Sequence, residues 1–176
     1  MMLDSTLTFE PKGTSLATVS AAGTSTNAID LGVTNGIGGS NGRDIGLGTD
    51  SHGIRTFVAL SGTISTSATN TTLQFKLQGA PDNGSGAPGT FVDFGVSPAY
   101  TVTELQAKYG EAFFFAGTVP PRPPGVAPPR FLQLAYVPAN GSITAGTITA
   151  GLSIGNDEST AYPANFTVPP TSGAGS

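Results

Sequence analysis

Few residues in this sequence could carry metal or nucleophilic chemistry. The 176-residue chain has one histidine and no cysteine. His52 lies close in sequence to Asp44 and Asp50, and a carboxylate–histidine cluster is a plausible ligand set for a metal ion. The three residues lie in or just after a glycine-dense stretch, however. The sequence also has no Gly-x-Ser-x-Gly run between an expected strand and an expected helix, the elbow that would supply the nucleophilic serine of a catalytic triad with His52. We therefore interpret this segment as a polar loop and expect no metal site and no catalytic residues.

Paired carboxylates offer a second possible chemistry. Asp93, Glu104 and Glu111 could supply the acid and base of a glycoside hydrolase if the fold brought two of them together. Glu104 already has a structural explanation, because it stands three residues after Thr101 in a helix-capping pattern. A glycoside hydrolase therefore remains an alternative, and it requires that the fold bring two of these carboxylates together.

Two glycine-containing motifs resemble ligand loops without completing them. The run from Gly36 to Gly42 lacks the Gly-Lys-Ser/Thr ending of a phosphate-binding loop. Asp82-Asn83-Gly84 lacks the later glutamate of a calcium loop and reads as a turn. We expect no cofactor.

The charge balance favours contact with proteins over contact with nucleic acid. The chain has seven basic and eleven acidic residues, a net charge of −4, and only 10% of its residues are charged. Nucleic-acid binding requires clustered lysine and arginine, which the sequence lacks. No secretory leader and no apolar stretch long enough to span a membrane is visible, so we expect synthesis in a cytoplasm and no membrane partner.

Alternating apolar residues predict an all-β fold. In the clearest case, Leu73, Phe75 and Leu77 alternate with polar residues, which indicates a strand with one buried face. A Thr-rich stretch with Leu3, Leu7 and Phe9 suits an N-terminal strand. Further strands are expected over 54–64, 91–96, 112–119, 130–137 and 147–154. Seven or eight strands at this spacing indicate a jelly-roll-like β-sandwich with one short helix starting at Thr101 or Thr103.

Proline and glycine mark the segments that leave the sandwich. Six prolines fall between Pro120 and Pro129, which excludes a sheet interior and predicts an extended excursion. Residues after Gly155 show no strand pattern. We therefore divide the chain into a β-sandwich domain, residues 1–155, and an extended C-terminal arm, residues 156–176.

Aromatic and proline residues are the candidate contacts with partners. In the run Phe113-Phe114-Phe115, neighbouring rings face opposite sides of a strand, so Phe114 could be an interface anchor, although a strand buried on both faces explains the run as well. The full set of candidate interaction residues is Phe114, Pro120, Pro121, Pro123, Pro124, Tyr162 and Phe166.

The order of several motifs resembles a known family. Asn27-Ala-Ile-Asp-Leu-Gly32, Arg43-Asp-Ile-Gly46 and the strand Thr149-Ala-Gly-Leu152 follow one another as in phage capsid cement proteins of the Bordetella-phage type. The resemblance covers about residues 3–155. It implies a jelly-roll-like fold, self-association as a dimer or trimer, and attachment to the major capsid protein on the outside of a tailed-phage capsid.

A second functional reading is a carbohydrate-binding or adhesin-type sandwich of a phage tail or fibre. Sugar-binding sites usually present an aromatic ring, and this chain has no tryptophan and four tyrosines. In this alternative Tyr100, Tyr109 and Tyr136 are the candidate sugar contacts.

Overall fold

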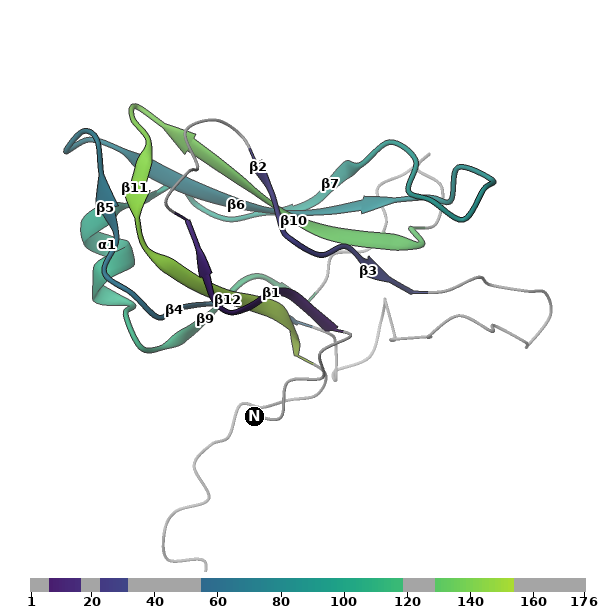
Figure 1. Ribbon diagram of the computed structural model, residues 1–176, viewed down its shortest axis with the longest axis horizontal. Helices are drawn as coiled ribbons and strands as arrows, with labels where there is room; N and C mark the ends of the chain where they lie inside the picture. The colour runs from purple at the N-terminus through teal and green to yellow at the C-terminus, as the bar shows by residue number, and fades with distance from the viewer. Residues whose placement is uncertain (1–6, 17–22, 32–54, 119–128, 154–176) are drawn as a thin grey trace, which may run out of the picture.

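The computed structural model describes residues 7–16, 23–31, 55–118 and 129–153, with the backbone alone described for 112–118. Within these ranges the chain forms mostly β-strands and one short helix (Figure 1). The elements are β1 (Thr8–Ser15), β2 (Gly23–Thr24), β3 (Ile29–Asp30), β4 (Arg55–Leu60), β5 (Ser65–Thr66), β6 (Thr72–Ala80), β7 (Val92–Val96), β8 (Tyr100–Thr101), α1 (Val102–Ala107), β9 (Ala112–Thr118), β10 (Phe131–Ala139), β11 (Ile143–Ala145) and β12 (Thr147–Ser153).

Two main sheets stack to form a jelly-roll sandwich. Sheet A has the order β1-β12-β4-β9. Sheet B has the order β2-β10-β6-β7, with β3 also on β10 and β8 also on β6. The first strand pairs antiparallel with the last, and the pairs β2/β3–β10, β4–β9 and β6–β7 are nested inside it. This nested folding of one long hairpin is the jelly-roll arrangement, and the predicted fold class is confirmed.

The core lies between the sheets and is built from alternate positions of each strand. Leu73, Phe75 and Leu77 of β6 are fully buried, whereas the residues between them are only partly buried. In β10, Leu132 and Leu134 are fully buried on the core face, while Phe131 and Ala135 on the other face are also buried, at 6% exposure. Burying such side chains contributes about 1.5–3 kcal/mol each, so the two-residue periodicity of these segments determines which face turns inward.

Two strand predictions differ from the structure. The predicted strand over 54–64 ends at Leu60, because the chain turns after Ser61 and Ile64 enters the core separately. At the N-terminus, β1 starts at Thr8, one residue after the predicted strand residue Leu7, whereas Leu3 lies outside the described residues. Its register against β12 is irregular, and it tolerates Pro11 because the proline lies on the outermost strand of sheet A.

Helix α1 and its capping confirm the sequence prediction. The Thr101 side chain accepts a hydrogen bond from the Glu104 backbone N–H, and the Glu104 carboxylate accepts one from the Thr101 backbone N–H. Leu105 anchors the helix in the core. At six residues α1 is far too short to cross a bilayer, and none of the described helical structure is long and apolar enough to do so.

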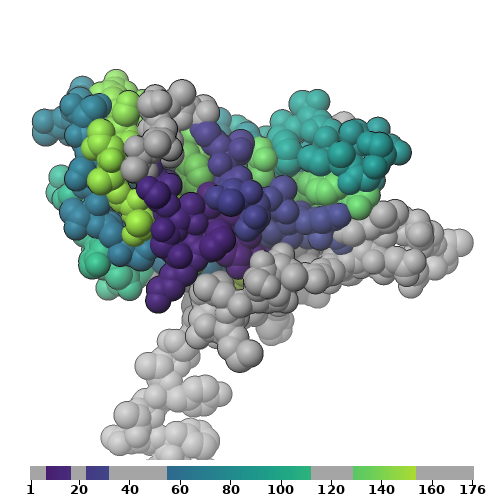
Figure 2. Space-filling view, in the orientation of Figure 1, coloured from purple at the N-terminus to yellow at the C-terminus, as the bar shows by residue number. Residues whose placement is uncertain are grey.

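A buried carboxylate links the two sheets along one side of the sandwich. Glu10 of β1 is 2% exposed, and its Oε1 accepts hydrogen bonds from the Tyr136 hydroxyl at 2.8 Å and from the Thr26 backbone N–H at 3.0 Å. Figure 2 shows β1 and the β2–β3 segment lying against each other on this side. Burial, followed by the nearby Glu10 carboxylate, raises the pKa of Tyr136, so the phenol keeps its proton and donates to Glu10.

Candidate interaction surface

The outer face of sheet B carries a hydrogen-bonded row of amide and charged side chains. Gln133 donates to Gln78 Oε1 at 2.8 Å, and Gln78 donates to Asp93 Oδ1 at 2.7 Å. Lys76 Nζ lies 2.7 Å from Asp93 Oδ2 and completes the row across β10, β6 and β7. Because each side chain holds the next, the row is an ordered part of the surface of sheet B. We call it, together with Gln74, the glutamine face.

The glutamine face is nearly neutral because its charges cancel in place. Burial tends to raise the pKa of Asp93, but hydrogen bonds from Lys76 and Gln78 outweigh it and hold that pKa below its ordinary value. Val96, 46% exposed, stands opposite Lys76 in the β6–β7 register and adds an apolar side chain beside the row. Unpaired charges hold water tightly, and removing that water on docking is costly. Because the charges of the glutamine face are already paired, a partner that docks here would displace little such water.

The lowered pKa of Asp93 predicts a dependence of stability on pH. The carboxylate stabilises the fold above its unfolded-state pKa of about 3.9, and this contribution is lost as the pH falls through the lower folded-state value. We expect Asp93→Asn to cost about 0.5 kcal/mol at neutral pH, as for partly exposed ion pairs, and to cost progressively less in acid. Urea unfolding at several pH values measures this, and a pH-independent difference between the two proteins would contradict it.

An ion-pair cluster holds the start of β10. The Arg130 guanidinium donates to both carboxylate oxygens of Asp30 at 2.9 Å and also pairs with Asp82. Asp82 in turn accepts from the backbone N–H groups of Gly84 and Gly86, which confirms the predicted turn. These backbone hydrogen bonds, and then Arg130, lower the pKa of Asp82. The cluster joins β3, the 81–89 loop and β10 at the point where the chain enters from residues 119–128.

The candidate acid–base carboxylates have structural roles in separate places. Asp93 belongs to the glutamine face, and Glu104 caps α1, where hydrogen bonds from the Thr101 backbone and side chain lower its pKa. A general acid needs a raised pKa, so neither group is prepared for that task. Glu111 is exposed just before β9. Among the described residues no group of three His, Asp or Glu side chains could hold a metal ion.

Most of the predicted contact residues lie outside the described part of the chain. Phe114 is in β9, where the backbone register pairs it with Phe57 of β4. Phe57 pairs with Gly151 of β12 and is not part of the main core cluster, but it is buried, at 1% exposure. The remaining candidates outside the described residues are Pro120, Pro121, Pro123, Pro124, Tyr162 and Phe166, together with Asp44, Asp50 and His52.

The three tyrosines proposed as sugar contacts differ in accessibility. Tyr136 is 2% exposed and donates to Glu10, so it cannot contact a glycan and that part of the prediction is wrong. Tyr100 packs against the core beside Phe75. Tyr109, at 56% exposure, is the accessible one of the three.

The glutamine face itself was not predicted as a site. Its sequence signal is the polar half of the alternation in LQFKLQ, together with Gln133 in the RFLQL strand. That signal normally indicates a solvated strand face. The cross-strand pairing of Gln78 with Gln133 becomes apparent when the β6–β10 register is known.

The stacked sheets and their nested strand pairs define the general class: an all-β protein of the jelly-roll type, here with a nearly neutral row of side chains on the outer face of sheet B. The chain matches the Bbp16 family over residues 14–152. It therefore belongs to this family of Bordetella phage proteins, which indicates a phage structural protein. No curated protein matches the sequence.

Proposed function

We propose that the protein is a capsid decoration, or cement, protein that binds the outside of a tailed-phage capsid and stabilises contacts between major capsid protein subunits. The observation that carries this proposal is the charge-compensated outer face of sheet B, in a jelly roll that belongs to a phage family. The protein acts without catalysis, as a dimer or trimer, after synthesis in the host cytoplasm.

The glutamine face suits a docking role because association there leaves few charges unpaired. Removing an isolated charge from water costs several kcal/mol. In contrast, Asp93 already accepts from Lys76 and Gln78 within the protein. A specific contact buries about 1,600 Å² in total, and a sheet face of several strands offers ordered area on this scale. Amide groups at its edges can pair with backbone groups of the capsid.

Oligomerisation would strengthen attachment to a repeating shell. When two docking surfaces belong to one oligomer, binding of the first raises the effective concentration of the second, and avidity can exceed the single-site affinity by about 10²–10⁴. The net charge of −4 gives the protein no electrostatic attraction to the packaged DNA. Nucleic acid and membrane are therefore not partners in this proposal.

The primary test is to add purified protein to assembled heads that lack it and to image the heads. We expect symmetric copies on the shell exterior that bridge capsid subunits, with heads that resist a higher temperature. Heads that remain bare at saturating protein, or protein located on the tail, would reject the decoration role.

A charge placed on the glutamine face tests the docking surface in the same assay. Val96→Glu sets a carboxylate opposite Lys76, a pairing that sheet B tolerates, and we expect about tenfold weaker cosedimentation with heads. Thr103→Glu in α1 is the matched control, because it adds the same charge in the first turn of a helix, where it is favourable. Equal binding by the two variants would remove the glutamine face from the contact.

A further inference from the structure

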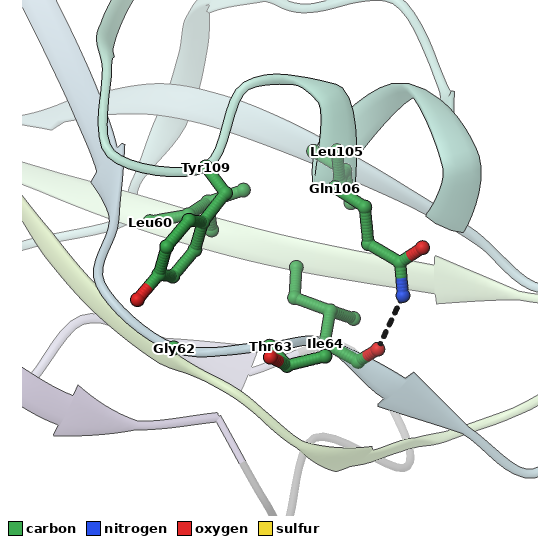
Figure 3. A pocket seen from close by; sticks show the side chains of 7 residues that line it. All are labelled: Leu60, Gly62, Thr63, Ile64, Leu105, Gln106 and Tyr109. Atoms are coloured by element: carbon green, nitrogen blue, oxygen red, sulfur yellow. Dashed lines mark hydrogen bonds between the residues drawn. The ribbon is translucent and has the colours of Figure 1, made fainter.

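We infer that the protein has a binding site for a neutral oligosaccharide in the groove between α1 and the chain segment that follows β4. This inference goes beyond the decoration role, which does not require it. The groove encloses a hollow of about 280 Å³ (Figure 3), lined by Leu60, Gly62, Thr63, Ile64, Leu105, Gln106 and Tyr109. A second hollow of about 440 Å³ adjoins it and shares Ile64 and Gln106.

The aromatic wall of the groove is held by the backbone while its ring remains free for contact. Tyr109 forms a parallel bridge with Leu60, and the next N–H, that of Gly110, donates to the Leu60 carbonyl at 3.1 Å. The ring is nevertheless 56% exposed and lies along one side of the hollow. An accessible aromatic ring on a fixed backbone can offer its face to an apolar surface and its hydroxyl to a polar group.

The opposite wall supplies an oriented amide. The Gln106 side-chain nitrogen donates to the Ile64 backbone carbonyl at 3.0 Å, which fixes the direction of the amide. Its carbonyl oxygen forms no hydrogen bond within the described part of the protein and points away from that contact (Figure 3). It is therefore available to accept a hydrogen bond from a ligand hydroxyl.

The composition of the lining selects the ligand class. None of the described residues that line the two hollows is charged, so an ionic ligand would find no counter-charge among them. Leu60, Ile64 and Leu105 form a floor that is already packed, each at most 2% exposed. A large apolar side chain from a partner protein therefore gains little new apolar contact there.

A sugar matches what remains accessible. The wall of the second hollow includes residues that bear hydroxyl groups: Ser65, Thr66, Ser67 and Thr69 from the segment after β4, and Thr103 from α1. A pyranose has a face of C–H groups, which can stack on the Tyr109 ring, and hydroxyls, which can pair with Gln106 and with this wall. Pockets of this size with a few convergent polar groups bind small ligands, and jelly rolls include lectin domains.

The experiment titrates the ¹⁵N-labelled full chain with glucose, galactose, mannose, N-acetylglucosamine, maltotriose and chitotriose. We expect at least one of them to shift the resonances of the groove, with Gln106 and Tyr109 among those affected. Sialyllactose, which is anionic and of trisaccharide size, should not bind. A panel in which no sugar perturbs the groove would overturn the inference.

Variants then distinguish stacking from a general effect on the fold. Tyr109→Ala should weaken binding of the responsive sugar about tenfold, while Tyr109→Phe retains the ring and most of the affinity. Val96→Ala is the control. It shortens an exposed apolar side chain on sheet B, outside the groove, and should leave sugar binding unchanged. If Tyr109→Ala left sugar affinity unchanged but reduced binding to heads, the groove would be a protein contact and the inference would be wrong. Failure of head binding with sugar binding retained would instead reject the decoration role alone.

Discussion

Replacement of Glu10 by alanine is expected to reduce the free energy of unfolding by about 2–4 kcal/mol, because one buried donor loses its acceptor and a second hydrogen bond is lost. The Tyr136 hydroxyl and the Thr26 N–H both donate to Glu10 Oε1. In the variant the buried Tyr136 hydroxyl would lose its acceptor, which costs about 1–3 kcal/mol, and the loss of the hydrogen bond from Thr26, an exposed residue, adds about 0.5–1.5 kcal/mol. Since domains are stable by only about 5–15 kcal/mol, chemical denaturation would show a large shift.

Two companion variants separate the roles of the carboxylate. Glu10→Gln keeps an acceptor oxygen for both donors and removes the charge, so we expect a loss below about 1 kcal/mol. Tyr136→Phe removes one donor and should cost about 1–2 kcal/mol. The Glu10 Oε2 atom is buried and receives no hydrogen bond from the described residues, which is why neutralising the charge should be tolerated. An alanine variant as stable as the glutamine variant would show that this link between the sheets is unimportant.

The fold class followed from alternation, and the reason is physical. In β6 and β10 each inward side chain is large and apolar, so burial alone determines the face and hence the register. The same logic identified the capping box of α1, because a threonine and a glutamate three residues apart satisfy each other locally. Structural features that depend on residues close together in the sequence, such as the buried face of a strand and a helix cap, were therefore predictable.

Features that depend on distant pairing were not predictable. The sequence places Gln78 and Gln133 on separate strands, 55 residues apart, and their hydrogen bond exists because β6 and β10 pair in one particular register. Glu10 looks like an ordinary surface residue in a polar strand, yet the β2–β3 segment and Tyr136 bury it. Tyr109 could not be separated from Tyr136 by residue type, because their exposure follows from topology.

The glycine of the strand TITAGLS gives the second large effect. A Cβ at Gly151 would lie 2.7 Å from the Leu7 carbonyl oxygen and 3.0 Å from the Phe57 ring. The carbonyl is backbone next to β1 and cannot rotate aside, so the close packing of β1 and β4 on β12 requires glycine here. We expect Gly151→Ala to cost about 1–3 kcal/mol through overpacking, and Gly151→Val to cost more.

Gly23 provides the matched control for this steric argument. It also lies in a strand, β2, but beyond its chain neighbours a Cβ there would meet no atom of the described residues within 4 Å. Gly23→Ala should therefore leave stability unchanged or raise it by about 0.5 kcal/mol, because alanine restricts the unfolded chain more than glycine does. Urea unfolding of both variants measures the contrast. Equal destabilisation would assign the effect to the strand backbone, whereas loss at Gly151 alone would show that the position opposite Phe57 and Thr8 determines how closely sheet A is assembled.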